Sequence, residues 1–418
     1  MNRPPIARHA AGIFFPLRPA LRLDGHSYTP ALLQRILMLA GRLASFEQVA
    51  VALEVAAGVQ LSGRHVQRLT QEVGADLARR RDEQADRHRR RELPPQAAAP
   101  PVAVVEVDGG RLGTRQAGAG PGVHHAQAKE DKIACLVGLR SDVHAADPQP
   151  EPPAAFRDAR RVARLVRQFQ GQVLPAEEAA SDAPPAAPDA DDRPDRPERL
   201  VRTCVASMSD SRAFGPLAAA EAQARGFFDA PRQAFLGDGQ KYNWWIQRAY
   251  FPHFEPIADF LHVLCYLYQG AWAVGADEAS RWRQFEAWMR ACWQGRVGEV
   301  LSELTTWQER LGRPPPEADA QDPRRLVQEV ERYVRNNQER MDYPRYRRAG
   351  LPVTSSWVES LVGEFNGRVK GRDKYWNRSA GAEAILQVRA AVLSEDGRLA
   401  RYFAERPGNP FRRRQTVP

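Results

Sequence analysis

The chain contains little cysteine. Its four cysteines are Cys135, Cys204, Cys265 and Cys292; they lie far apart, and none belongs to a Cys-x-x-Cys pair. A structural zinc site or a disulfide-rich secreted domain would need clustered or regularly spaced cysteines. The sequence therefore favours a protein of a reducing compartment, without a disulfide framework.

Long apolar runs are also missing. The most apolar stretch, residues 260–276, is interrupted by His262 and Gln269, and a membrane-spanning helix needs about 20 predominantly apolar residues. The N-terminal segment shows no continuous apolar core of the kind found in signal peptides. We therefore expect a soluble, cytoplasmic protein.

Lysine is rare, and the cationic residues are almost all arginine. Of 60 Lys and Arg residues, five are lysines, and the net charge is +9. A basic chain favours a polyanionic partner, although charge alone does not say which one. With 43% hydrophobic residues in 418, the chain is too apolar to be wholly disordered and is long enough for two or three folded units.

Residues 1–95 carry helical patterns and a net charge of +6. Serine N-caps predict two short helices, 45–57 and 62–77, in the proportions of a helix-turn-helix unit. The second helix would present Arg64 and Arg68 near its start. We interpret the region as DNA-binding, but an ordinary helical hairpin fits the same pattern.

Apolar, β-branched runs alternate with helical patterns over the middle of the chain, which predicts an α/β fold. The runs expected to form strands are 102–110, 132–141, 199–208 and 232–239, and residues 254–263 are expected to form a strand that runs into a helix. Between them, residues 147–198 form a Pro-rich acidic insertion. Its segment 175–198 holds six prolines and a net charge of −6, so we expect it to be disordered, with a helix over 152–170 just before it.

Three acidic residues occupy related positions in this pattern. Asp108 and Asp238 each end an apolar strand, and Glu359 lies on a late helix expected over 353–371. Acids at the ends of buried strands are costly to desolvate unless they are paired or bind a metal, and converging carboxylates suit Mg²⁺ or Mn²⁺. Taken singly, each acid would more simply cap a helix or a turn. Their shared setting favours a metal site.

The segments around these acids resemble bacterial insertion-sequence DDE transposases of the ISKra type, a group similar to the Mutator-like elements. The segments that carry the resemblance are VEVDGGRL at Asp108, LGDGQKYNWWIQRAYFP at Asp238, ADFLH at 258–262, LPVTSSWVESLVGEFNGRVKGRDKYWN at Glu359, and QVRAAVLSEDGRL at 387–399. Together they cover about 102–140 and 199–400.

This resemblance implies an RNase H-like catalytic core interrupted by an all-α insertion and preceded by a helix-turn-helix-like N-terminal domain. Asp108, Asp238 and Glu359 would bind two Mg²⁺ ions, with Mn²⁺ as a substitute, and catalyse phosphodiester cleavage and strand transfer. The partners would be double-stranded DNA, both the element's terminal repeats and the target, and at least one further copy of the chain. The protein would be bacterial and nucleoid-associated.

The predicted parts follow one another along the chain. They are a helical DNA-binding region 1–95, the core segments 96–146 and 199–263 separated by the insertion 147–198, a helical insertion 264–342 rich in Trp, a final core helix with a basic segment 343–400, and a basic tail 401–418.

Several further residues are candidates for the same site. Asp259 and His262 of the ADFLH segment would orient a scissile phosphate or a metal-bound water, or else form a structural hydrogen bond. Glu364 is the rival of Glu359, but five residues turn a helix by a net of about 140°, so both cannot face one site. The residues expected to contact DNA beside the site are Lys241, Arg368, Lys370, Arg372, Lys374 and Trp376.

Two other functions fit the three acids. An RNase H-like DNA nuclease or resolvase would cut without strand transfer. A catalytically inactive transposase relic would bind DNA without cutting it. A metal-dependent nicking assay and a strand-transfer assay separate these alternatives from a transposase.

Overall fold

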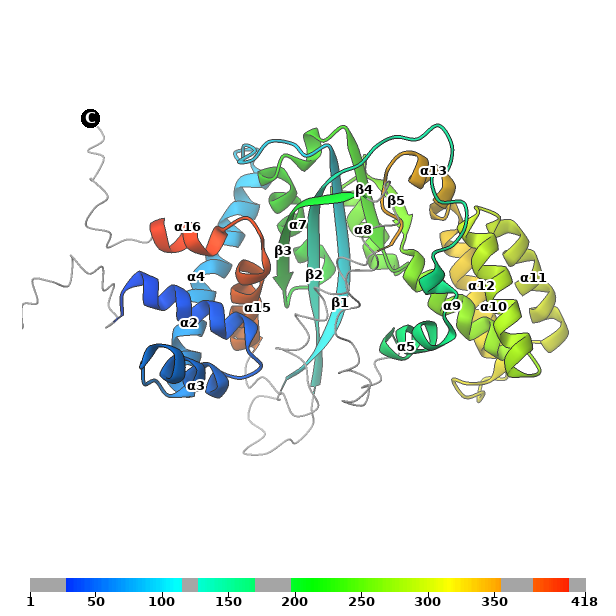
Figure 1. Cartoon of the computed structure of the whole chain (residues 1–418), viewed down its shortest axis with the longest axis horizontal. Helices are drawn as coiled ribbons and strands as arrows, with labels where there is room; N and C mark the ends of the chain where they lie inside the picture. Colours follow the sequence, from blue (N-terminus) through cyan, green and yellow to red (C-terminus); the bar gives the residue numbers. More distant parts are fainter. Residues whose placement is uncertain (1–27, 115–126, 170–196, 355–378, 406–418) are drawn as a thin grey trace, which may run out of the picture.

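A computed structural model describes residues 28–114, 127–169, 197–354 and 379–405. The fold is mixed α/β, as the alternation of apolar runs and helical patterns predicted. A central sheet stands between two groups of helices (Figure 1). Among the described residues, no helix is both long and apolar enough to cross a bilayer.

The sheet has five strands in the order β3-β2-β1-β4-β5. The strands are β1 Val102–Thr114, β2 Gln127–Arg140, β3 Glu198–Ser207, β4 Arg232–Gly237 and β5 Glu255–Ala258. Strands β1, β4 and β5 are parallel to one another, and β2 runs antiparallel to both β1 and β3. All five strands were predicted from the sequence, and the pairing brings β1 and β4 together although more than 100 residues separate them.

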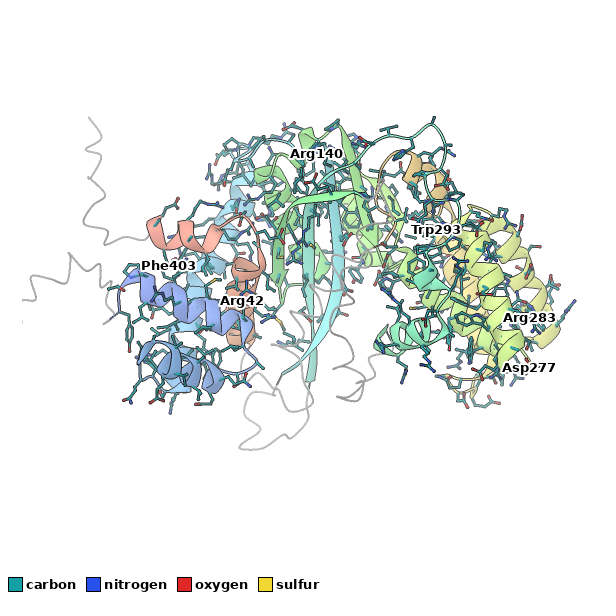
Figure 2. The ribbon with its side chains drawn as sticks, in the orientation of Figure 1. Arg42, Arg140, Asp277, Arg283, Trp293 and Phe403 are labelled. Carbon is teal, nitrogen blue, oxygen red and sulfur yellow. The ribbon has the colours of Figure 1, made fainter. Side chains whose placement is uncertain are left out.

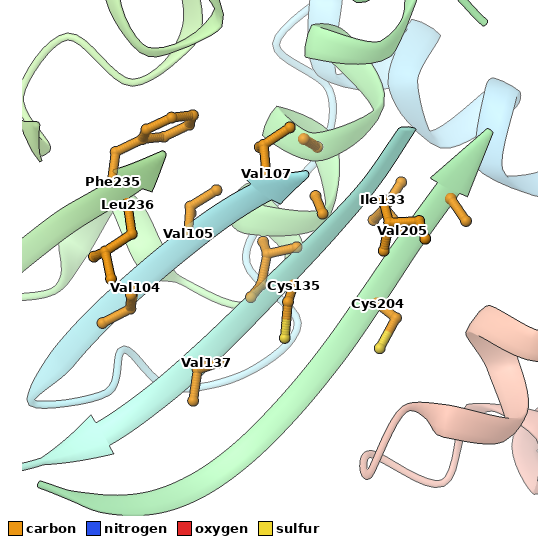
Figure 3. Packing of buried hydrophobic residues seen from close by; sticks show 14 of the residues in the cluster. Val104, Val105, Val107, Ile133, Cys135, Val137, Cys204, Val205, Phe235 and Leu236 are labelled. Atoms are coloured by element: carbon orange, nitrogen blue, oxygen red, sulfur yellow. The ribbon is translucent and has the colours of Figure 1, made fainter. Parts of the chain in front are cut away.

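Apolar side chains alternate between the two faces of the sheet, as the period of a strand requires. Val105 and Phe235 point to one face and Val104 and Leu236 to the other (Figure 3). Helix α8, Lys241–Tyr250, covers the Phe235 face, together with α7, Ser211–Ala224, which follows β3. Helix α8 therefore begins close to the carboxyl end of β4, which it follows along the chain.

Helix α15, Ser379–Leu393, lies along the outer edge of β3. The backbone N–H of Cys204 donates to Ser394 Oγ at 3.0 Å, and that of Met208 donates to Glu383 Oε2 at 2.6 Å. Exposed strand edges invite pairing with other chains. Here the side chains of the helical segment take up donors of the edge strand.

The N-terminal helices are α2 Pro30–Arg42, α3 Phe46–Ala57 and α4 Gly63–Arg89, and they pack around α15 and α16, Arg398–Glu405. Ser45 and Ser62 cap α3 and α4, as predicted. Helix α4 does not end near residue 77 but continues for three more turns. Its extension packs against α7 and α15, and this tertiary burial explains the extra length.

A second group of helices lies beside β5. It comprises α9 Phe260–Val274, α10 Glu278–Trp293, α11 Val297–Leu311, α12 Pro323–Asn337 and α13 Tyr343–Arg348, with α5, Ala159–Phe169, packed on α9. Trp293 lies on the opposite side of the sheet from Phe403 of α16 (Figure 2). Trp288 and Trp293 are fully buried, while Trp272, Trp282 and Trp307 are only partly buried.

Several predicted boundaries are displaced. Strand β1 continues to Thr114, past its predicted end at residue 110, because β2 pairs with it over its whole length, so Asp108 lies within β1 and does not end it. The helical segment begins at Phe260 rather than at residue 264, and β3 already begins at Glu198, inside the predicted insertion. Helix α16 continues to Glu405, into the predicted tail. The helix expected over 353–371 and most of the acidic segment 175–198 lie outside the described residues.

Candidate active site

Two of the three predicted acids lie side by side. Val107 of β1 pairs with Gly237 of β4 in parallel register, so the next residues along, Asp108 and Asp238, stand at adjacent positions on one edge of the sheet. Asp108 Oδ1 accepts a hydrogen bond from the N–H of Gly109 at 2.7 Å. The strand pairing thus brings together two carboxylates that are distant in sequence.

Asn243 ties the two strand ends together. Its side chain is fully buried, and Nδ2 donates to the carbonyl of Val107 at 3.1 Å and to Asp238 Oδ1 at 2.8 Å. The N–H of Gln240 donates to the same Oδ1 at 2.8 Å. Asn243 was not predicted from the sequence. The feature that could have indicated it is a polar residue in the first turn of the helix that follows Asp238.

The turn after Asp238 leaves no room for a side chain. Gly239 has φ +93°, and a Cβ there would stand 2.4 Å from the ring of Tyr333 on α12. Asn337 of the same helix accepts a hydrogen bond from Trp244 Nε1 of α8 at 2.8 Å. The helices beside β5 therefore buttress the Asp238 turn, and glycine is needed at this position.

Asp259 is a further acid on the same edge. Ala258 of β5 pairs with Gly237 of β4, so Asp259 stands beside Asp238 in the register. Its side chain is buried and caps α9 through the N–H of Leu261. Asp238 and Asp259 thus directly follow β4 and β5, and Asp108 lies beside them within β1, at the point where the pairing of β1 with β4 ends.

His262 lies one turn into α9 and is hydrogen-bonded to Asp259, with 2.7 Å between Nδ1 and Oδ2. Burial opposes the charged imidazole, but the bond to Asp259 and the negative charges of Asp259, Asp238 and Asp108 together raise the pKa of His262 to about 9. The imidazole is therefore a cation at neutral pH. Asp259 and His262, whose roles the sequence left open, are therefore hydrogen-bonded to each other.

Tyr242 and Lys132 complete the described surroundings. Lys132 is buried, with Nζ 4.2 Å from the centre of the Tyr242 ring and 3.1 Å from Glu130 Oε2. Burial and the charges of Asp238 and Asp108 raise the pKa of Tyr242 far above its ordinary value. Because Asp108 and Asp238 both act on Tyr242 and on His262, their charges share one small region.

The other predicted site residues divide into two groups. Arg64 and Arg68 are exposed at the start of α4, and Lys241 is exposed at the start of α8. The remaining ones lie outside the described residues: Glu359, its rival Glu364, and Arg368, Lys370, Arg372, Lys374 and Trp376. The structure therefore brings together Asp108, Asp238, Asp259 and His262.

The carboxylates of Asp108 and Asp238 are the type of ligand that a divalent cation needs. Over the residues described, no group of three or more His, Cys, Asp or Glu side chains is placed to hold a metal ion, and Glu359 is not among them. Both hydrogen bonds that the described residues donate to Asp238 fall on Oδ1, so Oδ2 has no donor among the described residues. Carboxylate oxygens are the ligands that Mg²⁺ and Mn²⁺ prefer.

Comparisons with known proteins add nothing to this picture, because no family model and no curated protein matches the chain. The function is therefore inferred from the site and from the sequence motifs that surround it.

Proposed function

We propose that the chain is a DNA transposase of the DDE type, with an RNase H-like core that binds Mg²⁺ through Asp108, Asp238 and Glu359. The observation that carries the proposal is the placement of Asp108 and Asp238 at adjacent positions, each one residue past Val107 and Gly237, the last pair that joins the parallel strands β1 and β4. This is the strand-Asp, strand-Asp part of the layout that the sequence resemblance implies. Glu359 is assigned from its motif alone.

Divalent cations, when bound, supply charge neutralisation and activation of the attacking oxygen in phosphoryl transfer. The chain's own residues have distinct tasks. Asn243 and the start of α8 orient the carboxylate of Asp238. His262, kept protonated by Asp259, places a positive charge where a scissile phosphate would lie, and Lys241 adds a second cation at the start of α8.

The helical parts fit a role in DNA binding. Helix α4 presents Arg64 and Arg68 to solvent at the start of a helix that follows a short turn, which suits contact with DNA. We assign recognition of the terminal repeats to this helix and expect at least two copies of the chain to bring two element ends together.

The test is metal-dependent nicking of a duplex that carries the DNA flanking the gene, followed by strand transfer from precut ends. We expect Asp108→Asn, Asp238→Asn and Glu359→Gln each to abolish nicking while DNA binding persists, because each change removes a charge and keeps the shape. Asp229→Asn, which neutralises an exposed acid outside the site, is the matched control and should cut like the wild type.

Other results of these assays would favour an alternative function or a different third ligand. Nicking without strand transfer would indicate the nuclease or resolvase alternative. Binding without nicking in either Mg²⁺ or Mn²⁺ would indicate a relic. A normal Glu359→Gln variant beside an inactive Glu364→Gln variant would move the third ligand to Glu364.

A further inference from the structure

A groove lies between α5 and the first two helices of the group beside β5. It encloses about 470 Å³, within the range of small-molecule sites. One wall is formed by Arg160, Arg164 and Arg167 of α5, and the other by Tyr268, Trp272 and Trp282 of α9 and α10. Nothing in the proposed catalytic chemistry uses these residues.

The arginine wall is built by the periodicity of α5. Positions 160, 164 and 167 are spaced as i, i+4 and i+7 and so lie on one face of the helix. On the opposite face, Val162 and Val166 are buried and belong to the hydrophobic core. Burial of these valines anchors α5 in the core and leaves the three arginines on the face that lines the groove.

The aromatic wall is held in place before any ligand arrives. Tyr268 and Trp272 stack with their ring centroids 3.9 Å apart, and Trp282 lies 5.0 Å from the ring of Phe285. Phe285 is fully buried and also contacts Tyr268 edge-on. Trp272 and Trp282 remain partly exposed to solvent.

The charge of the groove is positive. Glu278 is the one acid among the described residues that line it, against three arginines. Cations interleaved with aromatic faces are the combination that binds single-stranded nucleic acid, since phosphates follow the cations and any base can stack on a ring. A double helix hides its base faces and could use only the cations.

We propose that this groove binds an unpaired DNA strand, with a base stacked on Trp272 or Trp282 and backbone phosphates on Arg160, Arg164 and Arg167. The identity of the polyanion as DNA rests on the proposed function. Helix α9 connects the two sites, because it is capped by Asp259 and reaches Trp272 about 15 Å beyond His262, at 1.5 Å per residue. A DNA strand unpaired near Asp108 and Asp238 would therefore be within reach of the groove.

Fluorescence anisotropy with a labelled oligothymidylate of about 12 nucleotides tests this on the full chain. We expect Arg164→Glu to weaken binding at least tenfold and to lower the slope of log K against log salt by about 0.7 for each phosphate that no longer has a cationic partner. Trp272→Leu should weaken binding about 5- to 100-fold with the salt slope unchanged, because stacking carries no charge.

Two matched controls accompany these variants. Arg161→Glu changes an exposed arginine on the same helix that does not line the groove, and Trp307→Leu changes a partly buried tryptophan on α11. Both should bind oligothymidylate like the wild type. Circular dichroism melts verify that every variant is folded.

The proposal is overturned if Trp272→Leu keeps wild-type affinity, or if Arg164→Glu and Arg161→Glu weaken binding equally, since a diffuse basic surface would then explain the data and the groove would take another occupant. Failure of the proposed function is distinguishable. If the protein never nicks duplex DNA but loses oligothymidylate affinity in Trp272→Leu, the groove proposal stands and the proposed function fails. If it nicks normally and Trp272→Leu keeps wild-type affinity for oligothymidylate, the groove proposal fails and the proposed function stands.

Discussion

The charge of His262 is set by its neighbours rather than by its own chemistry. An ordinary imidazole is mostly neutral at neutral pH, but the carboxylate of Asp259 and the nearby Asp238 and Asp108 favour the cation. A raised pKa means that folding stabilises the protonated form. The resulting contribution to stability is fully present below about pH 6.5 and is lost as the pH rises through about 9.

This linkage predicts a pH-dependent stability difference. In metal-free urea unfolding, wild type should be more stable than His262→Gln at about pH 6, and the gap should shrink by about 1–3 kcal/mol at about pH 10. Glutamine retains a donor for Asp259 but cannot titrate. A gap of equal size at both pH values would show that the pair is not charged.

At the residue scale, the sequence predicted the acids but not their partners. Asp108, Asp238, Asp259 and His262 stand out because the apolar runs before the acids and a short motif mark them. Asn243 and Lys132 do not, because their roles depend on strand pairing and on the direction in which α8 leaves β4. Such contacts between distant segments have no local pattern.

At the scale of elements, helix contacts outweigh helix propensity. Gly74 of α4 crosses α15 so closely that a Cβ would stand 2.2 Å from the carbonyl oxygen of Ala384, whereas Gly298 of α11 has nothing within 4 Å of that position. Alanine is the better helix former at both positions by up to about 1 kcal/mol. The space around each glycine therefore decides whether its replacement by alanine stabilises or destabilises the protein.

The same substitution should act in opposite directions at the two positions. We expect Gly298→Ala to raise the free energy of unfolding by up to about 1 kcal/mol, and Gly74→Ala to lower it by about 1–3 kcal/mol because backbone must move. Thermal or urea unfolding measures both. Stabilisation by Gly74→Ala would mean that α4 and α15 are not in close contact.

Elements could be predicted where their burial is local. The strands 102–110 and 232–239 follow from apolar runs, and α3 begins at the predicted serine cap. The end of α4 could not be predicted, because residues 78–89 are polar and stay helical through packing on α7 and α15. Strand order also depends on pairing across long separations.

On the scale of the whole molecule, the N-terminal helices and the sheet share one hydrophobic core. Ile36 and Leu37 of α2 and Val73 of α4 belong to the same buried cluster as Val104 and Leu236 of the sheet. The division at residue 95 that composition indicated is therefore crossed by packing. Arg81 of α4 adds to this contact by donating to the carbonyl of Ala206 on β3 at 2.9 Å.

A shared core predicts cooperative unfolding. Leu37→Ala removes a fully buried side chain of α2 and should destabilise the protein by about 2–5 kcal/mol. In calorimetry we expect one transition, shifted as a whole to lower temperature. An early separate transition, with the sheet melting at its wild-type temperature, would show that the N-terminal helices fold independently.

An Mn²⁺ binding isotherm on the full chain without DNA tests whether Asp108 and Asp238 form one divalent-cation site, as we propose. We expect Asp108→Asn and Asp238→Asn each to weaken Mn²⁺ binding at least about tenfold, since removing a ligand costs no less than removing its supporting contacts, and Asp229→Asn to bind like the wild type. Equal Mn²⁺ affinity in the wild type and both site variants would contradict the proposal.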